Sequence, residues 1–196
     1  MILEKLNNYN IILASKSPRR QELLGQLDIN FKVADIIDVD ESYDESITAG
    51  DIPVHLSQKK AKAYLDSLKN NDLLITADTI VWLDDKALNK PKDRVEAIEM
   101  IKSLSGNSHK VYTGVTISSI NKSQSFVSET KVFFKQLTDD EVAYYVDKYK
   151  PFDKAGAYGI QEWIGYIGIT KIEGSYFNVM GLPVQQLYSE LIEFIG

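Results

Sequence analysis

Residues 13–24, LASKSPRRQELL, decide how the chain begins to fold. The apolar residues that open this stretch indicate the end of a buried strand, and Pro18 suits the first turn of a helix. Ser17 is then the predicted N-cap, which puts Arg19 and Arg20 in the first helical turn. Cations there oppose the helix dipole by roughly 0.3–1 kcal/mol each. Two in succession suggest a bound polyanion held by backbone N–H groups and arginines; the alternative is two solvated side chains.

The rest of the chain alternates predicted strands with predicted helices, which is typical of an α/β fold. We expect strands at residues 10–14, 31–37, 73–83, 111–120 and 125–134. We expect helices from Pro18 to about Leu27, from Pro53, at 95–104, from 139 to before Pro151, and from Pro183. An acidic loop is expected at 38–51, and a second hairpin over 163–170 and 175–179. Residues 1–196 are predicted to form a single domain.

The composition excludes several classes of protein. A net charge of −6 makes duplex nucleic acid and anionic membranes poor partners. The absence of cysteine excludes disulfides, thiolate catalysis and zinc–thiolate sites. Of the two histidines, His55 and His109, each is expected to lie at the surface or in packing. No apolar run is long enough to span a membrane, and MILEKLNNYN does not resemble a signal peptide, so we expect a cytoplasmic protein.

Asp78 is the clearest candidate for chemistry, because it lies in the apolar segment LLITADTIVWL. A carboxylate in a buried strand is costly unless it has a partner. With access to water, such a group is a natural general base. The alternative is that Asp78 and Thr79 form a bulge or turn in which the side chain binds backbone N–H groups.

Four other polar residues are candidates only in combination. They are Lys60 in QKKAKAYL, Lys90 in ALNKPKD, Glu41 in DVDES and Gln161 in DKAGAYGIQ. Alone, each lysine suggests a solvated surface residue and Glu41 suggests part of a hydrated loop. The amide of Gln161 donates and accepts at once, which suits recognition of a base edge; it could equally end a loop. The chain lacks both G-x-x-x-x-G-K-[ST] and G-x-G-x-x-G, which disfavours a P-loop ATPase or a Rossmann dehydrogenase.

Together these segments resemble the Maf family, the nucleoside triphosphate pyrophosphatases once known as septum-formation inhibitors. The matching blocks, in order from residue 13 to residue 184, are LASKSPRRQELL, KKAKA, ADTIV, LNKPKD, SGNSHKVYTGV, DKAGAYGIQ and GSYFNVMGLPV. The resemblance implies an α/β fold of the Maf/ITPase-like kind, with a central, curved mixed sheet flanked by helices and two lobes around a deep cleft.

The resemblance also implies an activity. The family hydrolyses a nucleoside triphosphate to its monophosphate and pyrophosphate with a divalent metal, Mg²⁺ or Mn²⁺. The resemblance also suggests that this protein forms a homodimer. Asp78 matches the family's proton acceptor. Arg19, Thr79 and Gln161 match the positions that distinguish the branch that prefers dTTP and UTP from the branch that prefers 7-methyl-GTP.

Further residues match by position. Ser15, Arg20, Lys60 and Lys90 match cleft residues implicated in phosphate binding, and Glu41 matches the metal ligand, with Asp40 left open as the alternative. One departure is that Glu162 follows the glutamine where the family often has glycine. The rival functions are a pyrophosphatase for 7-methyl-GTP or deaminated purine nucleotides, a non-catalytic nucleotide-binding regulator of septum formation, and an interaction domain with an incidental anion site.

Overall fold

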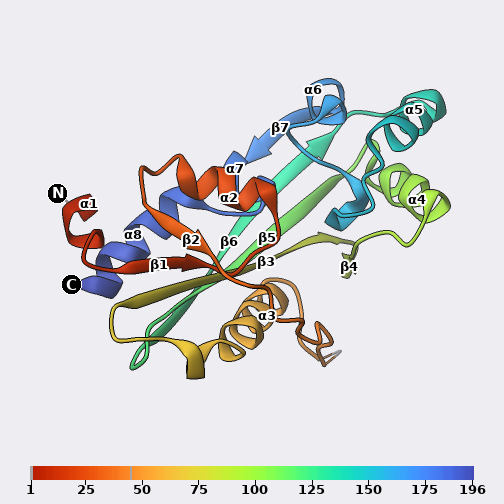
Figure 1. The fold of residues 1–196 in the computed structure, drawn as a ribbon. Coiled ribbons are helices and arrows are strands. Elements are labelled where there is room, and N and C mark those ends of the chain that lie inside the picture. Colours follow the sequence, from red (N-terminus) through yellow and green to blue (C-terminus); the bar gives the residue numbers. More distant parts are fainter. Residues whose placement is uncertain (1, 45) are drawn as a thin grey trace. The chain divides into compact units, whose positions relative to one another are not determined.

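The computed structural model describes residues 2–44 and 46–196 and contains one seven-stranded sheet (Figure 1). Its order is β2-β1-β3-β5-β6-β7, with β4 paired to β3. The strands are β1 (Asn10–Leu13), β2 (Phe31–Val33), β3 (Asp72–Leu83), β4 (Lys86–Leu88), β5 (Ser108–Ser118), β6 (Ser123–Phe134) and β7 (Ile169–Glu173). β1 runs parallel to β2 and β3, whereas β4 and β7 are antiparallel to β3 and β6. The predicted mixed sheet of an α/β fold is therefore confirmed.

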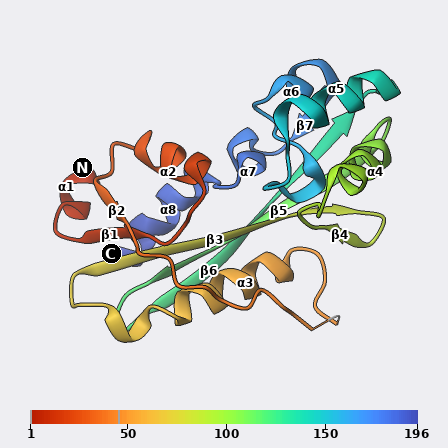
Figure 2. The same ribbon diagram turned by 45° about the vertical axis from the view of Figure 1, so that its right-hand side comes forward.

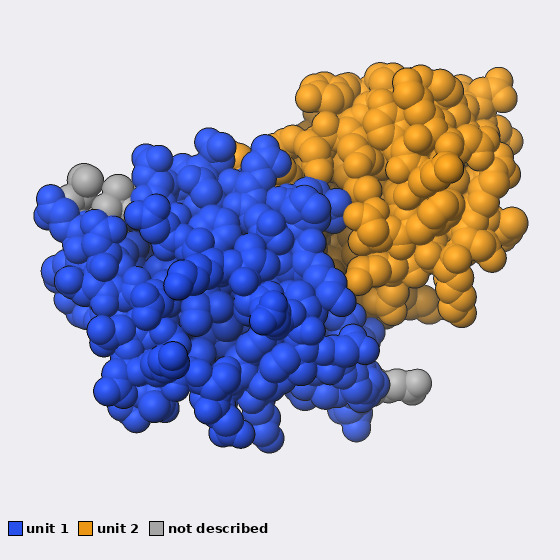
Figure 3. All heavy atoms as spheres, viewed as in Figure 1, with its two compact units in different colours: residues 1–78, 113–128, 181–196 blue, residues 79–112, 129–180 orange. Residues whose placement is uncertain are grey.

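The chain divides into two compact units, coloured separately in Figure 3. Unit 1 consists of residues 1–78, 113–128 and 181–196, and unit 2 of residues 79–112 and 129–180. The strands β3, β5 and β6 therefore contribute residues to both units. In β3 the division falls between Asp78 and Thr79, which are neighbours in the candidate catalytic segment.

The described residues of unit 1, which are 2–44, 46–78, 113–128 and 181–196, form five helical elements. They are α1 (Ile2–Leu6), α2 (Pro18–Gly25), α3 (Asp51–Lys62), η1 (Leu65–Ser67) and α8 (Val184–Ile195). Helix α8 buries Val184, Leu187, Leu191 and Phe194, which recur at helical spacing and so form one apolar face. Helix α3 runs along β3 in both ribbon views (Figures 1 and 2).

Helix α3 approaches β5 so closely that the strand has no room for a side chain at Gly114. A Cβ atom built there would lie 2.3 Å from the Pro53 carbonyl carbon and 2.3 Å from the Val54 nitrogen. Both atoms belong to the backbone of the first turns of α3, which cannot yield as a side chain would. Gly114 therefore sets how deeply the helix sits on the sheet of unit 1.

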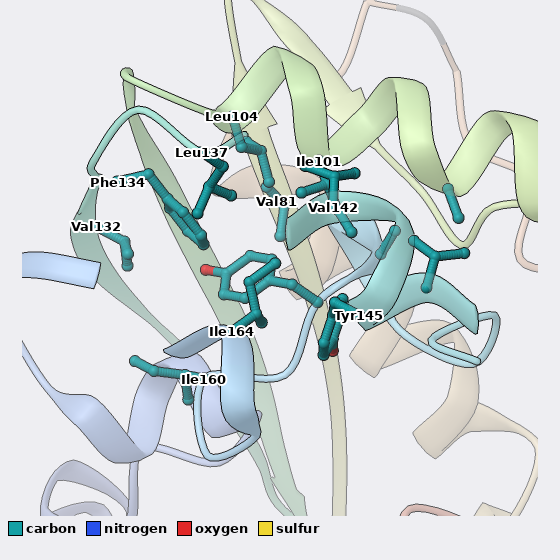
Figure 4. Packing of buried hydrophobic residues seen from close by; sticks show 14 of the residues in the cluster. Val81, Ile101, Leu104, Val132, Phe134, Leu137, Val142, Tyr145, Ile160 and Ile164 are labelled. Atoms are coloured by element: carbon teal, nitrogen blue, oxygen red, sulfur yellow. The ribbon is translucent and has the colours of Figure 1, made fainter. Parts of the chain in front are cut away.

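Unit 2 also contains five helical elements. They are α4 (Arg94–Leu104), α5 (Asp139–Tyr149), η2 (Ala155–Ala157), α6 (Trp163–Gly168) and α7 (Tyr176–Met180). Helix α4 packs against α5 and η2. Their apolar side chains, with those of the strands, form the cluster shown in Figure 4, which includes Val81, Ile101, Leu104, Phe134, Val142, Tyr145 and Ile164. Within the described part of the chain, every helix is too short or too polar to cross a membrane.

The hairpin expected beyond residue 162 is wrong. Residues 163–168 form the helix α6, residues 169–173 form β7, and residues 176–180 form the helix α7. The aromatic and branched residues of the segment favour a strand, but close packing overrides that preference. A Cβ at Gly165 would lie 1.8 Å from the Ile160 carbonyl oxygen, so only glycine permits this compact turn of helix. Two other boundaries differ from the predicted ones. The strand expected at 31–37 ends at Val33 (β2), and the helix expected from Pro53 begins two residues earlier (α3).

His109 is a packing residue, as one of the two sequence interpretations held. It is 2% exposed, and the centroid of its ring lies 5.7 Å from the centroid of the Phe134 ring and 5.4 Å from that of the Tyr158 ring. Its Nε2 atom lies 2.7 Å from the Tyr158 hydroxyl. Burial lowers the pKa of His109 to about 4, so the ring is neutral in the folded protein at neutral pH.

Gly114→Ala should destabilise the fold, because the new methyl group must displace the backbone of α3. Overpacking of this kind costs typically about 1–3 kcal/mol, and we expect a loss of about 2 kcal/mol in the free energy of unfolding, measured in urea. Gly25→Ala is the matched control, since its Cβ would meet only the Phe31 ring edge at 3.9 Å. That variant should be neutral or slightly more stable, because alanine favours the helix; equal losses in both variants would contradict the close approach.

His109 also predicts a pH dependence of stability. The folded pKa lies below the unfolded value of 6.5, so the unfolded chain binds the extra proton between these values and stability falls as the pH is lowered. The loss from this group between pH 7 and pH 5 is about 2 kcal/mol. His109→Gln should show a pH dependence weaker by about that amount when free energies of unfolding are compared at the two pH values. An unchanged slope would show that the imidazole titrates normally.

Candidate active site

The site in unit 1 follows from two matched periodicities. Thr76 and Asp78 are two residues apart in β3 and so point to the same face of the strand. Ser57 and Lys60 are three residues apart in α3 and so lie on the same face of the helix. The Thr76 hydroxyl donates to the Ser57 carbonyl at 2.7 Å, and the Lys60 ammonium donates to Asp78 at 2.6 Å. The helix is thus held on the strand at two successive points, and the second point is the candidate site.

Lys60 lies between two carboxylates. Its Nζ atom is 2.6 Å from Asp78 Oδ1 and 2.8 Å from Glu41 Oε1. The side chains of Lys60 and Asp78 are 18% and 14% exposed, whereas that of Glu41 is 49% exposed. Asp78 is therefore shielded but still reached by solvent, as a general base requires. It belongs to the uninterrupted strand β3, so the alternative of a turn between two short strands at this position is wrong.

The acidic loop offers Glu41, rather than Asp40, to this site. Asp40 accepts from the Ser42 N–H at 3.0 Å and from the Ser42 hydroxyl, and it pairs with Lys59 at 3.2 Å. The hydrogen bonds from Ser42, with a smaller contribution from Lys59, lower the pKa of Asp40 to about 2. Asp40 is thus engaged within its own loop, while Glu41 shares Lys60 with Asp78.

The turn before α2 has the predicted cap. Ser17 accepts from the Arg20 N–H at 3.5 Å, and Pro18 is the first helical residue. Ser15 is buried, and its hydroxyl accepts from the Ser17 N–H at 3.2 Å. Arg19 lies half-buried in the first helical turn. The hydroxyl groups of Ser15 and Ser17 therefore accept hydrogen bonds from backbone N–H groups at the start of α2.

Arg20 is oriented by main-chain carbonyls. Its Nε atom donates to the Gly181 oxygen at 2.7 Å and its Nη1 atom to the Ala77 oxygen at 2.9 Å. Burial lowers the pKa of Arg20, and Arg19 adds to this, while Asp78 and Glu41 raise it. The structure thus supplies a reason, besides any bound anion, for an arginine in the first turn of α2. Through Ala77, this arginine fixes the strand one residue before Asp78.

The remaining predicted residues lie in unit 2. Thr79 follows Asp78 in β3 and is half-buried, and Lys90 is exposed in the loop after β4. The Gly156 N–H donates to the Asn89 carbonyl at 3.3 Å, so the Lys90 loop and the DKAGAYGIQ segment lie side by side. The Gln161 Oε1 atom is buried and, in the described part of the chain, has no hydrogen-bond partner.

Three residues around Gln161 escaped the sequence interpretation. Glu162 accepts a hydrogen bond from the Tyr145 hydroxyl and pairs with Lys154 at 3.1 Å. The Lys154 side chain is only 9% exposed. Burial, and then the neighbouring Glu162, raise the pKa of Tyr145. The one sequence signal was that Glu162 replaces the glycine frequent in the resembled family.

Comparison with solved structures shows a similar fold, and comparison with known sequences shows the family. The arrangement of the chain is similar to that of a HAM1 protein from Coxiella burnetii, with a TM-score of 0.52 and 16% identity over 94% of this chain and 99% of that one. The chain belongs to the Maf family: the family model described as Maf-like protein matches residues 10–194. A dTTP/UTP pyrophosphatase of Bacteroides thetaiotaomicron is 53% identical, covering 97% of this chain and 98% of its own length. One of Parabacteroides distasonis is 54% identical, covering 98% and 100%.

Lys60→Met should destabilise the protein more than Lys59→Met, because it leaves two carboxylates facing each other. We expect Lys60→Met to lower the free energy of unfolding by about 2 kcal/mol, between the values for exposed and buried pairs. The loss for Lys59→Met should be below about 0.5 kcal/mol, since its partner Asp40 is 72% exposed. Adding Asp78→Asn to Lys60→Met should restore part of the loss in urea unfolding. Equal effects of the two lysine variants would show that the shielded pair is not stabilising.

Proposed function

We propose that this protein is a nucleoside triphosphate pyrophosphatase that hydrolyses dTTP and UTP to the monophosphate and pyrophosphate. The observation that carries the proposal is the Asp78 carboxylate, 2.6 Å from the Lys60 ammonium in a continuous strand. The names of the relatives, each a dTTP/UTP pyrophosphatase with about half of its residues identical to this chain, support the choice of substrate. Membership of the Maf family supports the class of reaction.

The proposed reaction is a displacement at the α-phosphorus. A water oxygen forms a bond to that phosphorus, the bond from it to the bridging oxygen breaks, and pyrophosphate leaves with the electron pair. Asp78 accepts the proton that the water loses. Lys60 and Lys90 are proposed to stabilise the charge that develops on pyrophosphate, since electrostatic stabilisation dominates phosphoryl transfer.

The other predicted residues have binding roles in this proposal. Ser15, Arg19 and Arg20 would hold the phosphate chain, helped by the backbone donors at the start of α2. Because Arg20 already donates to two carbonyl oxygens, its contribution is also to orient the strand that carries Asp78. Thr79 and Gln161 are proposed to select the pyrimidine base.

The residues around Lys60 also fit a divalent cation. Glu41 and Asp78 each place a carboxylate oxygen within 2.8 Å of the same Lys60 Nζ atom, so the two carboxylates lie close enough together for a divalent cation to bind beside the ammonium that they share. Residues 2–44 and 46–196 contain no group of three or more His, Cys, Asp or Glu that could enclose a metal. Glu41 would therefore hold Mg²⁺ or Mn²⁺ with help from substrate oxygens and water, as Mg²⁺ sites commonly do. The ion would neutralise charge on the phosphates.

Asp78→Asn tests the proposed base. The amide keeps the shape but cannot take up the proton, so kcat for UTP should fall by about 10²–10⁴-fold, while KM changes little. The exposed residue Asp85, in the turn after β3, offers a control, and Asp85→Asn should leave both constants unchanged. Near wild-type turnover by a folded Asp78→Asn variant would refute the role.

A substrate panel tests the activity itself. Pyrophosphate release should be faster from dTTP and UTP than from 7-methyl-GTP or ITP, and it should stop when EDTA removes the divalent ion. Faster release from either purine nucleotide would replace the proposed substrate by a rival one. Binding without release from any of them would support a regulator. The proposal includes a homodimer in the cytoplasm, which sedimentation equilibrium and cell fractionation test separately.

A further inference from the structure

The amide of Gln161 presents one atom that no group of the described chain satisfies. Its Oε1 atom is buried without a hydrogen-bond partner. A buried acceptor without a donor is unfavourable, and such groups in native proteins call for an explanation. A bound molecule that brings an N–H donor would satisfy it. Uracil and thymine carry such a donor at N3, next to an acceptor at O4, which an amide can match with both of its ends.

The backbone on both sides of Gln161 is tied to one carboxylate. The Gly159 N–H donates to the Tyr145 hydroxyl oxygen at 3.0 Å, and this hydroxyl donates to Glu162 Oε2. The other oxygen of Glu162 pairs with Lys154 at 3.1 Å. We call Glu162, Tyr145 and Lys154 the Glu162 bracket. It fixes the chain two residues before and one residue after the glutamine.

The bracket is built on a rigid base. The Tyr145 side chain is fully buried in the core cluster of unit 2, and Figure 4 labels it among the members of that cluster. Lys154 is nearly as buried and also pairs with Asp153 at 2.8 Å. A buried charge with its partner in place is costly to displace, so Tyr145 and Lys154 both hold Glu162 in a fixed position.

Gly159 is matched to the same carboxylate. A Cβ atom at Gly159 would lie 2.8 Å from Glu162 Cδ and 3.0 Å from Glu162 Oε2. The glycine therefore leaves the space that the glutamate side chain occupies. This steric fit is independent of the hydrogen bonds, and it too requires the Glu162 side chain to occupy this position.

We propose that Glu162 is a positioning residue that, through the bracket, holds the Gln161 amide in the orientation that selects uracil and thymine over cytosine. This inference rests on the proposed function and deepens it. An amide turned by half a revolution exchanges its donor and its acceptor. Cytosine also reverses both groups, with an acceptor at N3 and a donor at N4. A fixed amide therefore discriminates between the two bases, whereas a loosened one accommodates either.

The test measures kcat/KM for UTP and for CTP in Glu162→Gln and Tyr145→Phe. Each variant removes one link of the bracket while keeping the side-chain shape. We expect the UTP-to-CTP ratio of kcat/KM to fall about tenfold, the size of one discriminating hydrogen bond. The change should appear in KM, with kcat for UTP altered by less than about threefold.

Two controls match the variants in chemistry. Tyr144→Phe removes a hydroxyl of α5 whose side chain is exposed and which accepts a hydrogen bond from Lys148 at 2.7 Å. Glu173→Gln removes one half of the exposed pair with Lys171. Both should keep the wild-type ratio. Thermal unfolding of all variants reports any general loss of structure.

A double variant separates positioning from a structural role. In a Gln161→Ala background, Glu162→Gln should not lower the UTP-to-CTP ratio further, because the amide that it orients is gone. A further fall, or an unchanged ratio in both single variants, would overturn the inference while UTP hydrolysis still supports the proposed function. A wild-type ratio near one would overturn it as well. Failure of the wild type to cleave any pyrimidine triphosphate would instead refute the proposed function.

Discussion

The ion pair between Lys60 and Asp78 is the interaction on which the candidate site depends. It links a helix and a strand through residues that are 18 positions apart in sequence, and the hydrogen bond from Thr76 to Ser57 holds the same helix and strand in the same register. The same ammonium also pairs with Glu41, which lies in the acidic loop. One cation therefore gathers both carboxylates that the proposed chemistry uses, in a place where neither is fully removed from water.

The sequence was sufficient wherever a local rule decided the structure. The cap at Ser17 and the long strand through Asp78 both follow from neighbouring residues, and the structure contains them. The prediction for residues 163–168 was wrong because their preference for a strand is overridden by close packing that requires glycine at position 165. No local pattern in the sequence predicts such a contact.

The candidate site shows the same division. Asp78 and Arg20 were recognisable as unusual residues in their segments, and the structure gives each a partner. The partners themselves were not predictable, since the Arg20 guanidinium binds carbonyls 57 and 161 residues away. Tyr145 and Glu162 are 17 residues apart and were missed for this reason. Only a departure from the family pattern at Glu162 marked the place.

The two compact units are interleaved along the chain, which has a consequence for how such a protein arises. The polypeptide passes from one unit to the other between residues 78 and 79, 112 and 113, 128 and 129, and 180 and 181. Neither unit corresponds to one uninterrupted stretch of gene. A recombination event with two breakpoints cannot transplant either of them whole, because unit 1 consists of three segments of the chain and unit 2 of two.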